Sequence, residues 1–328
     1  MVRVKENVSS SISINIGVPQ GSVLGPILFL IYFNSIFEIR LLGTCTAFAD
    51  DLVLRYSNID IKTITRTIQC DLFKFNDWLT CHRMIMSDKF KIMYFNLKGN
   101  LSSDPIFYHH HIVNSICDNK CYEIESVKSF KYLGLFLENN LNWKMHLEYL
   151  EKILLIAVHK FYKLRYICPR NIMKLLYHSL IESVIMYGIS SWGGTYYSNV
   201  IGVYKAQKRI VKIIYFRAIR SATLPLFRDN NILPLRYLYV FRVLKIFFYR
   251  SGFVHHRNLN VHDTRNPYTF KIKRCNLELF RRCYLYMAPF WFHMLPCEVK
   301  SLPICQGNNF EKQMKAFIFN ISDIEVFF

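Results

Sequence analysis

Two adjacent aspartates, Asp50 and Asp51, interrupt a short apolar run between Thr46 and Leu54. Aspartate is a frequent turn residue, so the run predicts a tight β-hairpin whose turn holds both carboxylates. Two carboxylates in apolar surroundings cost free energy unless a positive charge holds them. A pair of divalent cations would supply that charge. The ordinary alternative is a plain turn in which the aspartates bond their own backbone.

A glycine-rich turn, Gly17 to Ser22, precedes this hairpin. Ser22 is a suitable helix N-cap and Pro26 fits a first helical turn, so a helix is expected to follow. Residues 27–37 are apolar on most faces, which predicts that this helix is buried. Free N–H groups at a helix start favour phosphate, and glycine lets a backbone approach a ligand closely. The alternative is a plain helix-entry turn.

The charge of the chain is unevenly distributed. The net charge is +19, but residues 1–150 carry 15 Lys and Arg against 14 Asp and Glu. Residues 151–328 carry 27 Lys and Arg against 9 Asp and Glu, a net of +18. The second half is therefore expected to attract a polyanion. The alternative is a basic protein that its charge keeps soluble.

Hydrophobic periodicity predicts an α+β fold, with the change to a helical pattern near residue 140. In the first half, strict alternation predicts a strand at residues 11–16, and helical spacing predicts one long helix at residues 59–79. Three further strands are expected at residues 91–95, 122–127 and 130–137. In the second half, helices are expected at residues 143–166, 171–187 and 198–216.

Four basic residues are spaced to share one face of the last of these helices: Lys205, Lys208, Arg209 and Lys212. The other side offers apolar residues such as Val203 and Ile210. A basic stripe of this kind suits contact with a nucleic-acid backbone. Solvated lysines on a helix packed against a core are the alternative.

Three features of the sequence concern the cellular location of the protein. The longest apolar run near the start, Ile27 to Phe33, is far shorter than the roughly 20 residues that a bilayer span needs. No signal-peptide pattern is present, and the ten cysteines show no regular framework. We expect an intracellular protein, in nucleus or cytoplasm, with no membrane partner.

Taken together, four motifs resemble the reverse transcriptases of non-LTR retrotransposons, with the jockey-like elements of arthropods as the nearest likeness. The motifs occur in the family's order and approximate spacing, over most of the chain. They are residues 17–26 (GVPQGSVLGP), 48–51 (FADD), 131–134 (KYLG) and 187–189 (YGI).

The resemblance implies roles for particular residues. Asp50 and Asp51 would be the catalytic aspartates that hold Mg²⁺ or Mn²⁺ in the polymerase palm, although consecutive strand residues point to opposite faces. Lys89 would protonate the departing pyrophosphate, a general-acid role. A surface lysine is the alternative for Lys89, because Phe90 follows it where the family commonly has threonine.

The remaining implied roles concern substrates. Pro19, Gln20 and Gly21 would touch the template or the incoming nucleotide. The primer grip would be Tyr132-Leu133-Gly134, with ordinary strand packing and a glycine bulge as the alternative. The four basic residues above would lie against a nucleic-acid backbone. The implied partners are an RNA template, a DNA primer and deoxynucleoside triphosphates.

The resemblance also implies a division of the chain: residues 1–140 a partial palm, 141–220 a helical thumb, and 221–328 a basic helical region. The family places its fingers and a first catalytic aspartate upstream of the glycine turn, where this sequence has sixteen residues. The chain is therefore expected to be inactive alone. The alternative is a non-enzymatic remnant that binds nucleic acid through its basic half.

Overall fold

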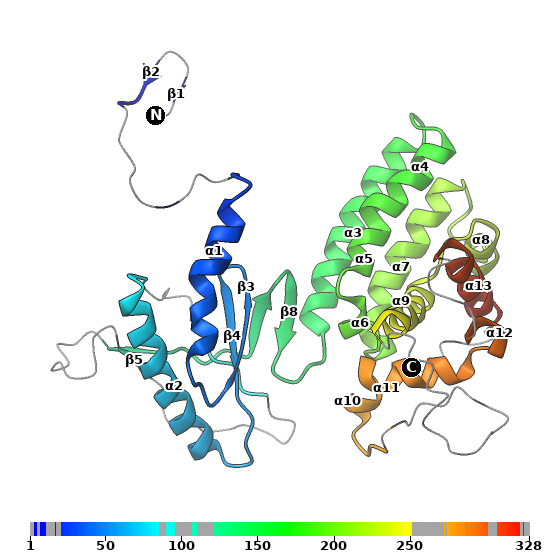
Figure 1. Cartoon of the computed structure of the whole chain (residues 1–328). Helices are drawn as coiled ribbons and strands as arrows, with labels where there is room; N and C mark the ends of the chain where they lie inside the picture. The colour runs from blue at the N-terminus through cyan, green and yellow to red at the C-terminus, as the bar shows by residue number, and fades with distance from the viewer. Residues whose placement is uncertain are drawn as a thin grey trace. The chain divides into compact units, whose positions relative to one another are not determined.

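The computed structural model of the chain forms two compact units, Met1–Lys128 and Ser129–Phe328 (Figure 1). It describes residues 3–4, 7–10, 17, 21–84, 90–95, 107–109, 121–250, 272, 274–300, 307–321 and 324. Each unit has its own hydrophobic core. The predicted division into palm, thumb and C-terminal region remains a prediction.

The first unit combines helices with antiparallel strand pairs. Its elements are β1 (Arg3–Val4), β2 (Asn7–Val8), α1 (Gly25–Asn34), the 3₁₀ helix η1 (Ser35–Glu38), β3 (Thr44–Phe48), β4 (Asp51–Arg55), α2 (Ile61–Cys81), β5 (Phe107–His109) and β6 (Cys121–Glu123). The pairs are β1 with β2, β3 with β4, and β5 with β6.

Helix α2 supplies most of the core of the first unit. Asp60 caps its start by accepting hydrogen bonds from the backbone N–H groups of Lys62 and Thr63. Its buried apolar residues recur at helical spacing: Ile68, Leu72, Phe75, Trp78 and Leu79. They pack with Ile36 and Ile124. The predicted long helix is confirmed, and so is the burial of most of its apolar stripe.

Two expectations about helix α1 are wrong. The helix begins at Gly25, with Leu24 as N-cap, and the Ser22 hydroxyl instead accepts a hydrogen bond from the Gly25 N–H at 3.0 Å. Most of its apolar side chains are also exposed, with Leu30 at 61% and Ile31 at 68%, and only Phe33 packs against the core of the unit. A helix that is apolar all round does not show which face packs, and here η1 and α2 supply the core instead.

The second unit is mostly helical. It begins with the antiparallel hairpin β7 (Ser129–Tyr132) and β8 (Leu135–Glu138). Its helices are α3 (Lys144–Leu164), α4 (Arg170–Leu176), the π-helix η2 (Tyr177–Glu182), α5 (Ser183–Met186), α6 (Ile189–Trp192), α7 (Tyr197–Ile214), α8 (Leu224–Asp229), α9 (Leu235–Arg250), α10 (Glu278–Arg281), α11 (Tyr284–Met294), α12 (Cys297–Lys300) and α13 (Gly307–Asn320).

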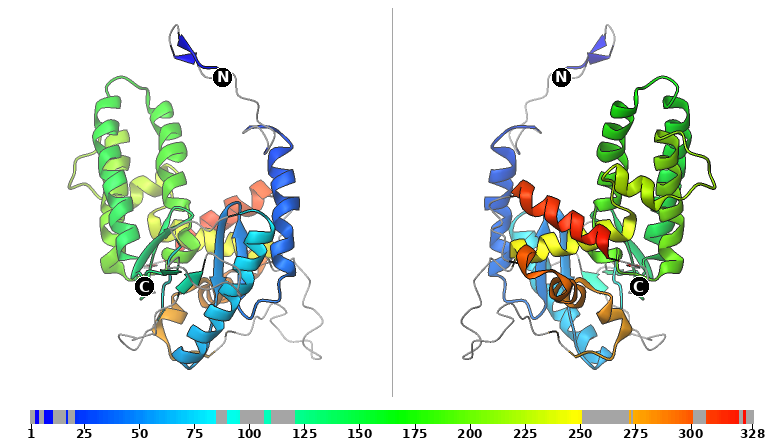
Figure 2. Two further views of the ribbon diagram at one scale, coloured as in Figure 1. Left: turned by 90° about the vertical axis from the view of Figure 1, so that its left-hand side faces the viewer. Right: turned by 90° about the vertical axis from the view of Figure 1, so that its right-hand side faces the viewer.

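One hydrophobic cluster runs through these helices. The helices α3 and α7 pack along each other, and Figure 2 shows the same bundle from two other directions. The C-terminal helices α11 and α13 pack against α9. Trp192, Tyr239 and Trp291 are fully buried in this cluster. The predicted α+β class and the three predicted helices of the second half are confirmed.

Several predicted strands differ from the structure. Residues 130–137 are the β7–β8 hairpin and not one strand, because Leu133 and Gly134 have φ angles of 45° and 81° and reverse the chain. In residues 91–95 only Ile92 forms a bridge, a parallel one to Ser126. The predicted strand at 11–16 lies outside the described residues. None of the described helices has the length and apolar content that a membrane crossing requires.

Candidate active site

The hairpin β3–β4 places Asp50 and Asp51 at its tip. Phe48 pairs with Asp51, so Ala49 and Asp50 form the turn and Asp51 opens β4. Ala49 has a φ of 52°, the left-handed conformation that a tight hairpin turn requires. Since Asp50 lies in the turn and not in a strand, the alternation of strand side chains does not separate the two carboxylates. The predicted hairpin is confirmed.

The surroundings of the two carboxylates differ from the expectation. Burial alternates along both strands, and Cys45, Ala47, Leu52 and Leu54 form the less exposed face. Asp51 belongs to the other face, and both aspartates are exposed. The apolar surroundings expected from the sequence are therefore wrong, because only one face of the hairpin packs. Water solvates both carboxylates, so their charges do not carry the cost of burial.

A buried carboxylate on helix α2 fixes the base of this hairpin. Asp71 is fully buried, and it accepts hydrogen bonds from the backbone N–H groups of Leu42 and Gly43 at 2.8 and 2.9 Å. Lys74 approaches the other Asp71 oxygen at 3.5 Å and donates to the Arg40 carbonyl at 2.8 Å. Helix α2 thereby holds the chain just before β3.

The residue that follows the hairpin, Tyr56, also interacts with Asp71. Tyr56 follows β4, and burial together with the charge of Asp71 raises the pKa of its hydroxyl. A Cβ atom at Gly43 would lie 2.3 Å from Cε1 of Tyr56, so only glycine lets the ring cross there. No sequence motif predicts this role of Asp71. Its acidic side chain within the apolar stripe of α2, directly before Leu72, was the available signal.

We predict that Asp71→Ala loosens the base of the hairpin and lowers the stability of the first unit by about 2 to 3 kcal/mol, since two backbone donors lose a charged acceptor. Hydrogen exchange should speed up first at the amides of Leu42 and Gly43, and then along β3 and β4. Arg66→Ala, an exposed change on the same helix, is the control and should leave that exchange unaltered. Unchanged exchange at Leu42 and Gly43 in Asp71→Ala would contradict the clamp.

The predicted glycine turn is only partly described. Gly17 and Gly21 have φ angles of 91° and 85°, and nothing lies within 4 Å of a Cβ built at either position. Both glycines therefore provide the backbone conformation and the open space that close approach of a ligand needs. Pro19, Gln20 and Lys89 lie outside the described residues.

The predicted primer grip is the turn of the β7–β8 hairpin in the second unit. Tyr132 ends β7, and Leu133 and Gly134 form the turn. The hydroxyl of Tyr187 donates to the Leu133 carbonyl, and the Tyr187 ring lies 3.4 Å from where a Gly134 Cβ would be. The structure thus brings together two motifs, 131–134 and 187–189, that are far apart in the sequence.

The predicted basic stripe lies on α7. Lys205 and Arg209 are exposed, whereas Val203, Ile210 and Ile214 are buried on the other side. Two further members of the stripe have partners within the chain. The Lys208 ammonium lies 3.8 Å from the ring centre of Tyr204, and Lys212 donates to the Ile219 carbonyl.

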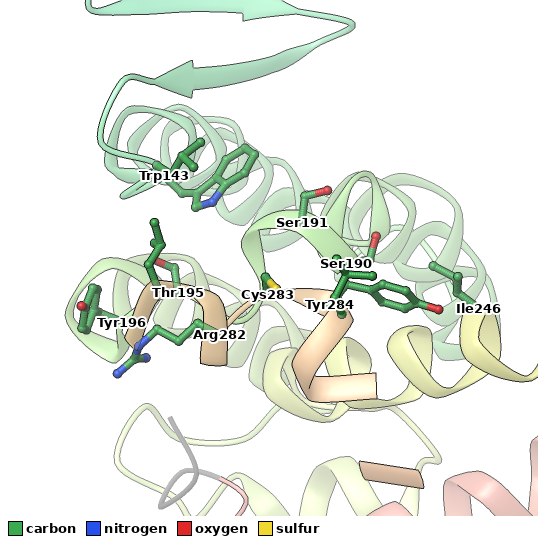
Figure 3. A pocket seen from close by; sticks show the side chains of 12 residues that line it. Trp143, Ser190, Ser191, Thr195, Tyr196, Ile246, Arg282, Cys283 and Tyr284 are labelled. Carbon is green, nitrogen blue, oxygen red and sulfur yellow. The ribbon is translucent and has the colours of Figure 1, made fainter. Parts of the chain in front are cut away.

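The second unit also contains a cavity of about 400 Å³ (Figure 3). Aromatic side chains line it, among them Trp143, Tyr196 and Tyr284. Arg282 lies over the Tyr196 ring at 4.0 Å and pairs with Glu278 at 2.8 Å. Because Glu278 already offsets the Arg282 charge, this cavity gives no argument for anion binding.

Oxygen donors for a metal ion are limited among the described residues. No group of three or more His, Cys, Asp and Glu side chains gathers there in a way that could hold a metal ion. Asp50 and Asp51 do provide two adjacent exposed carboxylates, the donor type that Mg²⁺ and Mn²⁺ prefer.

In this chain a hairpin with two adjacent carboxylates at its tip precedes a basic helical second unit. Residues 1–137 match the family described as reverse transcriptase (RNA-dependent DNA polymerase). The first 137 residues are therefore similar to reverse transcriptases, and the resemblance to retrotransposon reverse transcriptases seen in the sequence is confirmed.

Two relatives come from Drosophila melanogaster. The chain is 25% identical over 226 residues to a probable RNA-directed DNA polymerase from transposon X-element, an alignment of 65% of this chain and 23% of that protein. It is 27% identical over 254 residues to a probable RNA-directed DNA polymerase from transposon BS, covering 71% and 26%. The chain thus spans about a quarter of the length of these relatives. No solved structure matches it significantly.

Proposed function

We propose that this chain is the palm and thumb part of an RNA-directed DNA polymerase, which extends a DNA primer on an RNA template with deoxynucleoside triphosphates. The observation that carries the proposal is the position of Asp50 and Asp51 at the tip of β3–β4, within the stretch that matches the reverse transcriptase family. We also propose that the protein acts inside the cell, in the nucleus or the cytoplasm.

In this proposal Asp50 and Asp51 hold Mg²⁺ or Mn²⁺. Mg²⁺ in phosphoryl-transfer sites commonly takes one or two carboxylates and completes its shell with water and phosphate oxygens, which fits two exposed aspartates. Bound ions of this kind would lower the pKa of a primer 3′-hydroxyl and offset the charge of the triphosphate. The clamp by Asp71 keeps the hairpin that bears the two carboxylates in one place.

The other roles assign substrate contacts to this chain's residues. The open backbone at Gly21, with Pro19 and Gln20, would contact the template or the incoming nucleotide. Lys89 would donate a proton to pyrophosphate. The turn Tyr132-Leu133-Gly134, supported by Tyr187, would hold the primer.

The basic stripe on α7 would contact backbone phosphates, with sequence-independent binding as the result. Lys205 and Arg209 are its exposed members. Lys208 and Lys212 would take part by leaving the tyrosine ring and the carbonyl that they contact within the chain.

Binding and catalysis test this proposal separately. The chain should bind an RNA template annealed to a DNA primer, with affinity that falls steeply as salt rises. It should also bind Mn²⁺, measured by the loss of the free-ion paramagnetic resonance signal. A chain that binds neither would overturn the proposal. Strong Mg²⁺-dependent primer extension by the chain alone would support polymerase function but contradict the expectation that the chain is inactive alone.

A further inference from the structure

Exposed aromatic side chains and arginines gather where three helices of the second unit end or begin. Tyr162 lies in the last turn of α3, Tyr166 follows the end of α3, Arg170 begins α4, and Phe216 follows the end of α7. The exposed fractions of the three aromatic residues are 51% for Tyr162, 67% for Tyr166 and 53% for Phe216. Arg170 lies 5.8 Å from the ring centre of Tyr215, at the end of α7, and the exposed Arg217 and Arg220 follow Phe216 in the chain. We call this surface the helical tip, and it comprises Tyr162, Arg165, Tyr166, Arg170, Phe216, Arg217 and Arg220.

The guanidinium of Arg165 organises the rings of the helical tip. It lies 4.3 Å from the ring centre of Tyr162, 4.5 Å from that of Tyr166 and 5.3 Å from that of Phe216. It also donates a hydrogen bond to the Tyr166 hydroxyl. The rings of Tyr162 and Tyr166 meet edge to face at 6.1 Å. One cation thus holds three half-exposed rings from two helices around itself.

The arginines of the helical tip have few acidic neighbours along the chain. Between Lys152 and Arg228 there are 13 Lys and Arg, and the single acidic residue is Glu182. Glu182 bonds His178 at 2.7 Å and lies twelve residues beyond Arg170 on a continuous helical stretch, roughly 18 Å along the axis. In the described part of the chain, none of the four tip arginines forms an ion pair with a carboxylate.

We propose that the helical tip binds single-stranded nucleic acid, with unpaired bases stacked on its exposed rings and phosphates held by Arg170, Arg217 and Arg220. Aromatic rings beside a positive groove bind single strands with little sequence preference, since every base has a face that can stack. In a duplex the neighbouring bases already cover these faces. The tip is therefore distinct from the α7 stripe, which meets backbone phosphates and is suited to a duplex as well.

The positive charge of the helical tip favours a nucleic acid over an apolar partner. Ile167 and Ile219 are also exposed, at 79% and 84%, which a protein partner or a lipid surface could use. The arginines and the scarcity of carboxylates favour a polyanion, and half-exposed rings favour one with free bases. The inference needs neither Asp50 nor Asp51, so it goes beyond the polymerase site and stands or falls without it.

Fluorescence anisotropy of the full chain with a labelled single-stranded oligonucleotide, and with its duplex, tests the proposal. Tyr166→Ala with Phe216→Ala should weaken single-strand binding by about tenfold or more and leave duplex binding within twofold, because each stacked base contributes about that much. Tyr249→Ala, which removes a comparably exposed ring on α9, is the matched control and should change neither affinity.

Replacing the arginines of the helical tip should change the salt dependence of single-strand binding. Changing Arg170, Arg217 and Arg220 together to glutamine should reduce the slope of log affinity against log salt by about 2, since each lost phosphate contact on a single strand removes about 0.7. Circular dichroism and thermal melting check that each variant is folded. Asp50→Asn with Asp51→Asn should leave single-strand binding unaltered, so failure of the polymerase proposal would not imitate failure of this one.

Three results would overturn the inference. The first is single-strand affinity that stays unchanged in the folded ring variant. The second is an equal loss of single-strand and duplex affinity, which would make the rings structural supports. The third is binding of the tip to vesicles that contain phosphatidylserine, lost in the ring variant, together with no binding to oligonucleotides.

Discussion

Replacing Asp50 and Asp51 together by asparagine is expected to lower primer extension by at least about a thousandfold, equivalent to roughly 4 kcal/mol of transition-state stabilisation. Asparagine has nearly the same volume as aspartate but lacks the negative charge that a divalent cation requires. Both side chains are exposed at the tip of β3–β4, so the change should not disturb packing. The readout is the initial rate of RNA-directed extension by the chain joined to an upstream segment that supplies a further carboxylate.

Metal binding by the same variant can be measured without primer extension. The 328-residue chain should bind Mn²⁺ and lose most of that binding in the double variant, while its thermal melting stays unchanged. Asp229→Asn, an exposed aspartate in the second unit, is the control and should keep wild-type Mn²⁺ affinity. A double variant that keeps its Mn²⁺ affinity would remove Asp50 and Asp51 from the metal site.

The parts of the fold that the sequence predicts well are those with a strong local pattern. Helix α2 has a capping aspartate and an apolar stripe, and β3–β4 has alternation on both sides of a turn pair. The β7–β8 turn lacks such a pattern. Leu133 adopts a left-handed backbone that leucine disfavours, and the distant Tyr187 hydroxyl supports its carbonyl. A contact between residues 54 positions apart is not visible in a local pattern.

The candidate site shows the same limit. Asp50 and Asp51 were identified because adjacent carboxylates are conspicuous in a sequence, but their exposure depends on which hairpin face packs. Asp71 was missed because its partners are backbone groups nearly 30 residues away. The helical tip depends on α3 and α7 ending side by side, which brings Arg165 to Phe216. Residue types can be recognised from the sequence, whereas these juxtapositions follow from packing.

The position of helix α7 rests on a buried side chain, Gln207. Its amide nitrogen donates to the Tyr177 hydroxyl at 2.8 Å and to the Leu233 carbonyl at 3.0 Å. Its amide oxygen accepts from the Leu235 N–H at 2.9 Å. Burial raises the pKa of Tyr177, so its hydroxyl stays neutral in this network. One fully buried amide thereby joins α7 to η2 and to the start of α9.

Gln207→Leu is expected to destabilise the second unit by about 3 to 5 kcal/mol. Leucine fills a similar volume but leaves three buried polar groups without their partner, each at a cost of about 1 to 3 kcal/mol, and its own burial offsets only part of that loss. Urea unfolding followed by tryptophan fluorescence measures the change, because three of the four tryptophans lie in this unit.

Gln313→Leu tests whether the effect of Gln207→Leu comes from burial. Gln313 is exposed on α13, so the same substitution there should change stability by no more than about 0.5 kcal/mol. Equal effects of the two substitutions would mean that the buried network adds nothing. A large loss at Gln207 alone would show that this buried amide stabilises the unit that carries the basic stripe. Nucleic-acid binding by Lys205 and Arg209 should then weaken in Gln207→Leu at temperatures where the variant begins to unfold.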